Sequence, residues 1–451
     1  MMNKIIIFFF FLTLPVFAQQ DAEASRRDTL RFGTDTEITV LINSLRTEKN
    51  DYLDNELIEL ALNSRNQSIL TGVFAFFGER EKSGLEQRAI KAITERENET
   101  NETVLSSIDY LGRIKSEEAV PVIREVLDTE EKRFLITGFR AIARASSGNK
   151  ELSDDTADFL IDYYTYREPN NDNKSSIIAA IGETGSALGV PLLIDIVTNI
   201  DERVPLRIAA LGALSKIGDE KGLEAILGCI GTNDPNVRTA AVGALGPFSG
   251  EAVDKAILDA FRDSYFRTRI AAAQASRDRK LEASVPFLKY RAERDDVPNV
   301  KDEAIRALGA IANEEAIEVI KALFYDKKNS DRVRILSSDI LMKNAASENF
   351  SRLIIELDDA KTKNQTALYN GLLKTLGESI ITNENPDAEN LAIRLMKSGT
   401  PVEKMYGLDI AANNNLVRLK DEIITLTKEK NESIKRRAVR TAEKLGIDLT
   451  E

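Results

Sequence analysis

The sequence predicts an all-α fold, an α-solenoid in which about 12 to 13 helical hairpins stack in one row. First, one pattern of small, apolar and charged residues recurs along most of the 451-residue chain. Second, after the N-terminal segment the apolar residues come at helical spacing. Third, 30 % charged and only 6 % aromatic residues, with no tryptophan, favour surface-rich helices over a β-sandwich. Since one hairpin cannot bury its apolar face alone, neighbours must share a continuous core.

The N-terminus has the composition of an export signal. It reads "MMNKIIIFFFFLTLPVFAQQ", with one lysine, an apolar run over 5–12 and small-residue spacing at Val16 and Ala18. This order predicts a signal peptide over 1–18, cleaved after Ala18. The apolar stretch is shorter than the roughly 20 residues that span a bilayer, so no membrane span is expected after signal cleavage.

The rest of the chain is expected to be a single array. Residues 19–32 are expected to form a short linker, and 33–451 one repeat array whose best-formed repeats lie at 201–342. Richness in Asn, Lys and Ile favours a bacterial source. Export from a bacterium favours the periplasm as the location, with secretion as the alternative.

The repeating unit is clearest around Leu214, in "ALSKIGDEKGLEAI". Each unit has an apolar-periodic helix, a short turn with Gly or a small polar residue, a second helix and a polar link. Gly218 stands where a left-handed C-cap is needed, and Asp219 follows as an N-cap. Equivalent anchor positions are 31 to 39 residues apart. They are Leu45, Phe77, Leu111, Ile142, Ile181, Leu214, Leu245, Ser276, Leu308, Leu341, Leu376, Ala411 and Ala442.

Basic residues recur seven positions before most anchors from the middle of the chain onward. They are Lys174, Arg207, Arg238, Arg269, Lys301, Arg334, Lys404 and Lys435. Acidic residues often precede them by three to six positions, at Asp201, Asp234, Asp263 and Asp331. We favour a structural ladder in which these charges hydrogen-bond neighbouring units together. The alternative is a cationic stripe along the inner surface.

Two segments carry a family resemblance. "DPNVRTAAVGALG" (234–246) and "DERVPLRIAALGAL" (201–214) resemble HEAT repeats, in particular the short variety also found in phycobilisome lyases. The resemblance extends over roughly 30–446 and is strongest at 201–342. It implies a right-handed α-solenoid whose second helices line a concave surface that binds other macromolecules. Such a resemblance is specific for fold and says little about activity.

The composition excludes several classes of chemistry. The chain has no histidine, which rules out Ser-His-Asp and Cys-His catalysis and histidine-ligated zinc or haem. The lone cysteine, Cys229, cannot form an internal disulfide, and its apolar neighbours predict a buried, inert thiol. "GETGSALG" lacks the spacing of a phosphate loop, and "REPNNDNKSS" (167–176) that of a calcium loop, so the latter is expected as an inserted surface loop. We therefore predict no catalytic residue, cofactor or metal.

Charge is distributed unevenly. Residues 19–200 carry 21 Lys and Arg against 33 Asp and Glu, whereas 201–451 carries 39 against 40. An acidic chain with a pI near 5 is an improbable partner for nucleic acid.

The segment 261–294 departs from its neighbours, with nine basic and four acidic residues interleaved with aromatics. Arg and Tyr are typical of binding hot spots, so this segment is the predicted surface for a protein partner. The candidate residues are Arg262, Tyr265, Arg267, Arg269, Arg277, Arg279, Lys280, Tyr290, Arg291 and Arg294. The alternative is that the aromatics are core and the arginines form a solvated face. The basic terminal stretch 428–446 is interpreted as the polar cap of the array.

These observations favour an exported, non-enzymatic scaffold that mediates protein–protein interaction. Two alternatives remain. One is a lyase-like or other accessory enzyme built on the same repeats, as the resemblance to the lyases suggests. The other is a self-associating structural protein of the cell envelope.

Overall fold

The computed structural model describes residues 14–381 and 385–449, and within these ranges the chain is helical with no strand. The chain divides into two compact units, 1–237 and 238–451, with the boundary inside helix α14. The α-helices of the first unit are α1 Leu14–Phe32, α2 Asp35–Glu48, α3 Asp54–Asn63, α4 Gln67–Glu79, α5 Glu86–Thr94, α6 Asn101–Arg113, α7 Val120–Asp128, α8 Lys132–Ser146, α9 Lys150–Tyr166, α10 Asn171–Thr184, α11 Val190–Thr198, α12 Val204–Ile217 and α13 Leu223–Ile230.

The second unit begins inside α14 Pro235–Gly243. Its further helices are α15 Glu251–Ala260, α16 Phe266–Arg279, α17 Val285–Arg294, α18 Pro298–Ile311, α19 Glu314–Tyr325, α20 Asp331–Thr362, α21 Thr366–Glu378, α22 Pro386–Met396, α23 Pro401–Asn413, α24 Lys420–Thr427 and α25 Glu432–Leu445. Six short 3-10 helices precede second helices or links, at Arg96–Asn98, Glu117–Ala119, Ala187–Gly189, Glu220–Gly222, Glu282–Ser284 and Val417–Leu419. Among the described helices, none combines the length and the apolar character that crossing a bilayer requires.

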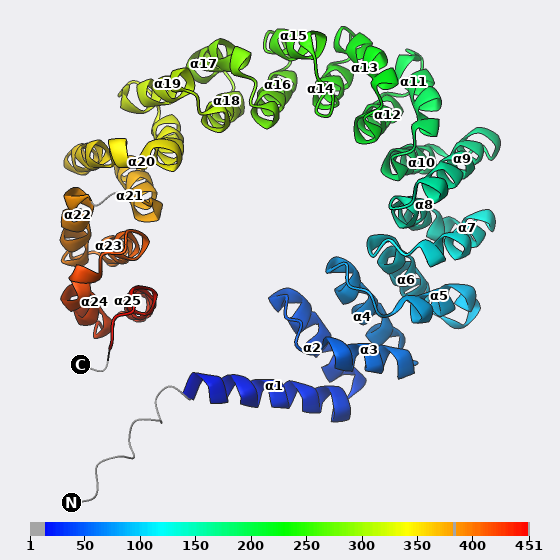
Figure 1. Cartoon of the computed structure of the whole chain (residues 1–451), viewed down its shortest axis with the longest axis horizontal. Coiled ribbons are helices and arrows are strands. Elements are labelled where there is room, and N and C mark those ends of the chain that lie inside the picture. The colour runs from blue at the N-terminus through cyan, green and yellow to red at the C-terminus, as the bar shows by residue number, and fades with distance from the viewer. Residues whose placement is uncertain (1–13, 382–384, 450–451) are drawn as a thin grey trace, which may run out of the picture. The chain divides into compact units, whose positions relative to one another are not determined.

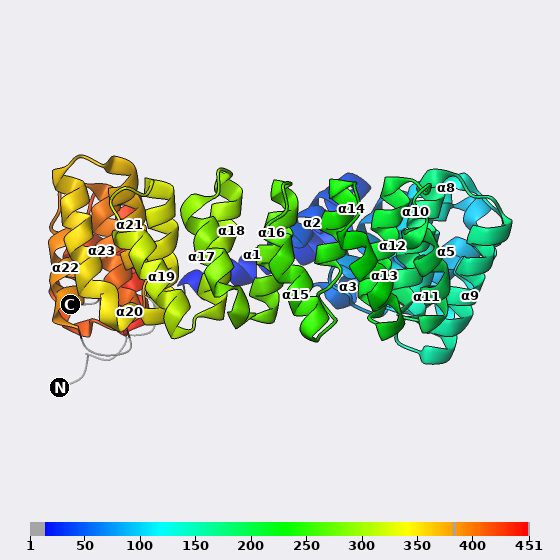
Figure 2. The same cartoon turned by 90° about the horizontal axis from the view of Figure 1, so that it is seen from above.

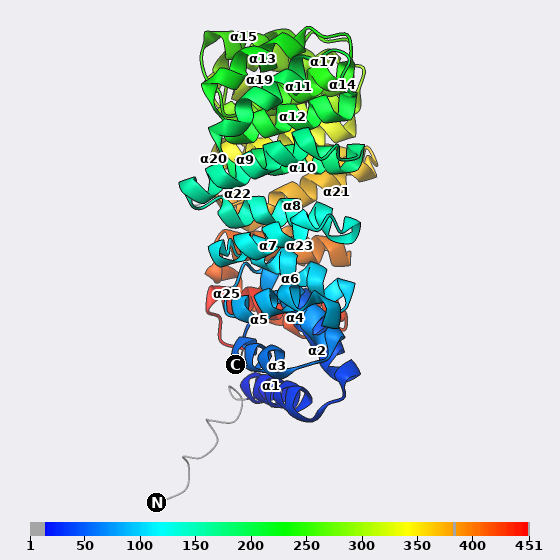
Figure 3. The ribbon, with the colours of Figure 1, turned by 90° about the vertical axis from the view of Figure 1, so that its right-hand side faces the viewer.

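The helices pair as the repeat predicts, which confirms the all-α solenoid. Twelve of the thirteen anchors lie in the first helix of a pair, and Leu245 lies two residues beyond α14. All thirteen are at most 1 % exposed. Figure 3 shows α6, α8, α10 and α12 of the first unit stacked one upon the next, and Figure 2 shows α16, α17 and α18 of the second unit side by side. The anchors thus form the continuous apolar core of each unit.

The turns follow the local chemistry of the sequence. Gly218 ends α12 in the left-handed conformation, with φ 67°, and Asp219 accepts a hydrogen bond from the N–H of Lys221 at 2.8 Å. The inserted loop expected at 167–176 is shorter than predicted, because α10 already begins at Asn171. The N-cap of α10 is Asn170, whose side chain accepts a hydrogen bond from the N–H of Asn173 at 2.9 Å. Polar residues therefore form the first turn of a helix here.

The N-terminal segment differs from the linker expected at 19–32, because these residues lie inside α1. No Gly or Pro interrupts the helix in this range. Both Arg26 Nη atoms donate to Glu48 at 2.8 Å, and Arg27 Nε donates to Glu56 at 2.9 Å. Leu30 is buried. Helix α1 is therefore attached to α2 and α3. Of the signal peptide predicted over 1–18, residues 1–13 lie outside the described residues, and 14–18 belong to the first turns of α1.

The two layers of each unit are arranged opposite to the expectation from the resemblance. Taken by itself, each unit is a curved double layer, and the first helices of the pairs, not the second, lie on its inner side (Figure 1). In the first unit the inner helices are α2, α4, α6, α8, α10 and α12. The expectation that second helices line the concave surface was wrong for this pairing.

Glycine gives the physical reason for this arrangement. A Cβ at Gly182 in α10 would lie 2.6 Å from the Cα of Ala213 in α12, and one at Gly112 in α6 would lie 2.6 Å from the Cα of Ala141 in α8. Real Cβ atoms do not approach other atoms so closely, so only glycine permits these contacts. Because successive first helices approach backbone to backbone, their layer is the shorter one and becomes the inner side of the curve.

Charged rungs also connect successive pairs in the second unit. Arg238 donates from Nε and Nη2 to Asp263 at 2.7 and 3.0 Å, and Arg269 donates from the same two atoms to Asp295 at 2.8 Å each. Arg269 Nη1 also donates to the carbonyl of Asp263 at 3.0 Å. Such bidentate, charge-assisted pairs are among the stronger hydrogen bonds. Asp263 follows α15 and Asp295 follows α17, so each acid lies in the link after the second helix of a pair.

The other basic positions have varied contacts. Arg334 pairs with Glu356 at 2.8 Å, and Lys404 pairs with Glu429. Lys301 donates to the carbonyl of Glu293 at 3.0 Å. The remaining three bind differently: Arg207 donates to the carbonyl of Val197, Lys174 lies 5.5 Å from the ring centroid of Tyr164, and Lys435 lies 3.9 Å from Glu432 of its own helix.

The close contact at Gly182 generates a matched prediction. Gly182→Ala is expected to lower the urea midpoint of unfolding, because the overlap with Ala213 costs about 1–3 kcal/mol. Gly212→Ala is the control, since its Cβ meets nothing within 4 Å. This variant is expected to leave the midpoint unchanged or to raise it, because alanine in a helix favours folding by up to about 1 kcal/mol over glycine. Far-UV circular dichroism measures both, and equal midpoints would contradict the close approach.

Adjacent aspartates test the rungs. Burial alone would raise the pKa of Asp295, but hydrogen bonds from Arg269 and from the N–H of Val297 lower it below its usual value. The Asp295 side chain is 0 % exposed, whereas that of Asp296 is 90 % exposed. Asp295→Asn is expected to cost about 3 kcal/mol because it removes the buried carboxylate that binds two nitrogens of Arg269 and leaves only Asp296, at 3.3 Å, as a counter-charge. Asp296→Asn should cost less than about 1 kcal/mol. Urea titration of both variants checks the difference.

Candidate functional site

The basic and aromatic segment 261–294 divides among three places in the second unit. Arg262 follows α15, and Tyr290, Arg291 and Arg294 lie in α17. Tyr265 is the N-cap of α16, which also holds Arg267, Arg269, Arg277 and Arg279, and Lys280 is its C-cap. Because α15 and α17 are successive second helices, the first group lies on the outer layer (Figure 1). The structure therefore brings together only part of the predicted surface.

A groove lies between α15 and α17, and we call it the outer groove. Its volume is about 390 Å³, and it is lined by Phe261, Arg262, Pro286, Phe287, Tyr290 and Arg291. The rings of Phe261 and Phe287 stack with centroids 5.8 Å apart. Phe261 is buried and Tyr290 is 51 % exposed, so the groove has a fixed apolar base and an accessible aromatic edge.

Arginines are held against the aromatic rings of the outer groove. The guanidinium of Arg262 lies 5.0 Å from the centroid of Phe287, and those of Arg291 and Arg294 lie 5.2 and 5.6 Å from the centroid of Tyr290. Stacking of this kind is attractive and restricts the orientation of the guanidinium. Arg262 also pairs with Asp259 at 3.0 Å and Arg291 with Asp295 at 3.3 Å. Arg294 has no carboxylate partner among the described residues.

The arginines of α16 are mostly engaged inside the protein. Arg269 is buried, and its hydrogen bonds to Asp295 raise its pKa. Arg277 pairs with Asp278 at 2.9 Å and with Glu303. Arg279 donates to the carbonyl of Phe248 and to Asp254. These three contribute to packing and do not line the groove.

The remaining candidates lie at the two ends of α16. The exposed Arg267 lies 5.8 Å from the ring centroid of Phe266, beside Tyr265, and Lys280 is exposed at the C-cap. Conversely, sequence reasoning did not select Phe261 and Pro286 for the surface. Phe261 resembles a core residue, and Pro286 is one of the prolines that begin second helices. Phe261 is the C-cap of α15 and Pro286 is the second residue of α17, so no spacing within the repeat marks them as one surface.

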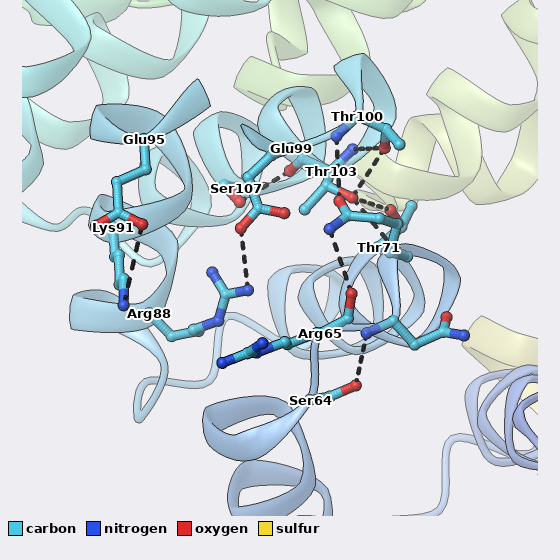
Figure 4. Close-up of polar contacts among 12 residues, drawn as sticks. Ser64, Arg65, Thr71, Arg88, Lys91, Glu95, Glu99, Thr100, Thr103 and Ser107 are labelled. Carbon is cyan, nitrogen blue, oxygen red and sulfur yellow. Dashed lines mark hydrogen bonds and ion pairs between the residues drawn. The ribbon is translucent and has the colours of Figure 1, made fainter. Parts of the chain in front are cut away.

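A second polar cluster lies where α4, α5 and α6 meet (Figure 4). Arg88 pairs with Glu99 at 3.1 Å, and their side chains are only 11 % and 10 % exposed. The hydroxyls of Thr71 and Thr103 share a hydrogen bond of 3.1 Å between the first helices α4 and α6. Thr239 and Thr268 repeat this bridge at 2.9 Å in the second unit. The repetition indicates that the cluster joins neighbouring pairs.

Groups suited to catalysis are few in the described part of the chain. Over 14–381 and 385–449, no set of three or more His, Cys, Asp or Glu side chains could hold a metal ion. Cys229 is 3 % exposed, and burial raises the pKa of its thiol. A thiol of this kind stays protonated and is a poor nucleophile. What the outer groove can do chemically is bind, through stacked arginines above an apolar base.

Solved structures with a similar fold include nuclear-transport receptors. In a complex of Kap95p with RanGDP, the matching chain is 12 % identical with a TM-score of 0.52, and the match covers 94 % of this chain and 61 % of that one. The karyopherin Kap121p is 11 % identical with a TM-score of 0.48, covering 96 % and 54 %. This chain thus spans little more than half the length of those proteins. At such identity the likeness to Kap95p shows the fold alone.

The comparison by family is more specific. No curated protein matches the chain. The family model described as "Spirochaete HEAT repeat protein" matches residues 30–441, which run from the end of α1 into the last helix, α25. The chain therefore belongs to the spirochaete HEAT repeat protein family.

Proposed function

We propose that this protein is an exported, non-enzymatic scaffold that binds a protein partner through the outer groove between α15 and α17. The observation that carries the proposal is the set of arginines stacked on Phe287 and Tyr290 above an apolar base. Arg and Tyr are the residue types that dominate binding energy in protein interfaces.

The groove is suited to a folded or extended protein segment. Phe261 and Phe287 supply apolar area at its centre, where water would be excluded on binding. Arg262 lines the groove and Arg294 stacks on Tyr290 beside it. Stacking restricts the rotamers of both arginines, so less side-chain entropy is lost when a partner binds. A partner with apolar and acidic residues would satisfy both features. The formal net charge of −12 disfavours nucleic acid.

A non-enzymatic role is supported by the chemistry of the chain. Histidine is absent from the sequence, and the single thiol is buried with a raised pKa. These features disfavour the lyase-like or accessory-enzyme alternative. A self-associating envelope protein stays open as the second alternative, and the recovery experiment below separates it from a scaffold with a different partner.

Export is supported by the order of residues at the N-terminus and by the contacts of α1. Arg26, Arg27 and Leu30, which attach α1 to its neighbours, all lie beyond the proposed cleavage after Ala18. Cleavage would therefore leave these contacts intact. The family is described as spirochaetal, which agrees with a bacterial source.

Charge reversal in the outer groove is expected to abolish partner recovery. Cells carrying tagged protein would be crosslinked and the bound proteins identified by mass spectrometry. Arg262→Glu with Arg294→Glu should reduce the recovered partner at least tenfold, since Arg262 lines the groove and Arg294 stacks on Tyr290 beside it. Arg436→Glu with Arg440→Glu in α25 makes the same charge change at exposed positions and is the control.

Unchanged recovery with the groove variant would contradict the assignment of this surface. Recovery of only the chain itself, unaffected by the groove variant, would instead support the self-associating protein.

The export proposal predicts a processed N-terminus. In the native host, fractionation should place the protein in the periplasmic fraction, and N-terminal sequencing should start at Gln19. Deletion of residues 2–18 should leave the protein in the cytoplasm. An unprocessed N-terminus in the cytoplasmic fraction of the full-length chain would overturn the proposal.

A further inference from the structure

Arg207 in α12 is a buried charge with an unusual partner. It is 6 % exposed and stands at one of the recurring basic positions. Its Nε donates to the carbonyl of Val197 at 3.0 Å, and its Nη2 lies 3.9 Å from the sulfur of Cys229. Among the described residues it has no carboxylate partner.

Arg334 shows what the same arrangement looks like when it is complete. Its Nε donates at 3.0 Å to the carbonyl of Phe324, ten residues earlier, as that of Arg207 does to Val197. Its Nη2 pairs at 2.8 Å with Glu356, 22 residues later. The residue 22 positions after Arg207 is Cys229. The two arginines therefore match atom by atom, except that a cysteine replaces the acid.

Three more of the recurring basic residues, like Arg334, pair with an acid that comes later in the chain. Arg238 and Arg269 pair with acids 25 and 26 residues later, and Lys404 pairs with Glu429, 25 residues later. Burial raises the pKa of the Cys229 thiol, so this group stays neutral near pH 7. A guanidinium remains charged under these conditions. Leaving it buried without a counter-charge is unfavourable, which makes this position receptive to an anion.

A cavity lies beside this arginine. It has a volume of about 420 Å³ and lies between α11 and α13, successive second helices of the first unit (Figure 1). Ile194, Val197 and Ala225 supply apolar wall, and Arg207 and Cys229 also line it. Two further charged side chains, Lys221 and Glu224, line the cavity as well, and neither contacts Arg207. Ile200, which is 81 % exposed, stands at its edge. We call it the Arg207 cavity.

We propose that the Arg207 cavity binds an Asp or Glu side chain, flanked by apolar residues, from a segment of a protein partner. The carboxylate takes the position that Glu356 occupies beside Arg334, and the flanking side chains contact Ile194, Val197 and Ile200. That the ligand belongs to a protein rests on the proposed function. A phosphate group fits less well, because it carries more charge and needs more donors than one buried guanidinium supplies.

Restoring the missing acid within the chain tests this inference. The probe is a soluble nonapeptide with a central Leu-Glu-Leu, and its twin carries Leu-Gln-Leu, both measured by fluorescence anisotropy. Wild type is expected to bind the Glu peptide at least tenfold more tightly than the Gln twin. Cys229→Glu should occupy Arg207 from within and abolish binding of the Glu peptide, whereas Cys229→Ser, the matched control, should bind it like wild type.

A thermal melt shows whether the new glutamate reaches Arg207. If it does, Cys229→Glu melts above Cys229→Ser, as expected for a completed rung. If it melts lower, Arg207→Gln becomes the test variant, and it should lose the preference for the Glu peptide while remaining helical by circular dichroism.

Three results would overturn the inference. The first is equal binding of the Glu peptide and its Gln twin to wild type. The second is undiminished binding of the Glu peptide by Cys229→Glu, or by Arg207→Gln where that is the test variant. The third is that free propionate stabilises wild type as much as the peptide does. Arg262→Glu with Arg294→Glu should bind the peptide like wild type, so failure at the outer groove is distinguishable from failure here.

Discussion

The structure depends on one constraint, which is that a helical pair can cover its apolar face only with the next pair. The thirteen anchor residues are almost completely buried, and each contacts a neighbour rather than a separate centre. The first helices meet most closely, because glycine at positions such as 112 and 182 lets two backbones touch. From this packing follow the curvature of each unit and the two-layer arrangement. It also leaves shallow grooves between successive second helices, where no glycine brings the backbones together, and both surfaces proposed to bind partners are of this type.

Buried charge is organised by the same repetition. Arg238 and Arg269 each pair with an acid 25 or 26 residues later, in the polar link that leads to the next helical pair. A rung of this kind contributes modestly to stability once desolvation is counted, but removing one partner is costly. Its main effect is to fix the register between neighbours. At Arg207 a cysteine stands where the equivalent position beside Arg334 has a glutamate, and no described residue supplies the missing acid. A position that elsewhere joins neighbouring segments is therefore proposed to bind an acid from a partner.

Much of the fold could be predicted from the sequence because the relevant rules are local. Helical spacing, the left-handed glycine at 218 and the cap at Asp219 depend on residues within a few positions. Features that depend on which segments meet could not be predicted. Asp234 precedes Arg238 closely, yet it caps α14 by accepting from the N–H groups of Asn236 and Val237, and the arginine pairs with Asp263 instead. Likewise the basic segment looked like one surface, but Arg269 is buried on α16, whereas Arg262, beyond the end of α15, is exposed.

The rung geometry has a consequence for how such a chain can change in length. Asp263 takes part in two successive contacts, because its carboxylate accepts from Arg238 and its backbone carbonyl accepts from Arg269. A gene duplication or deletion that adds or removes one whole period keeps each arginine together with its aspartate. One that cuts within a period separates the two and leaves a charge without its partner. Selection should therefore accept growth and shrinkage of this array only in whole periods.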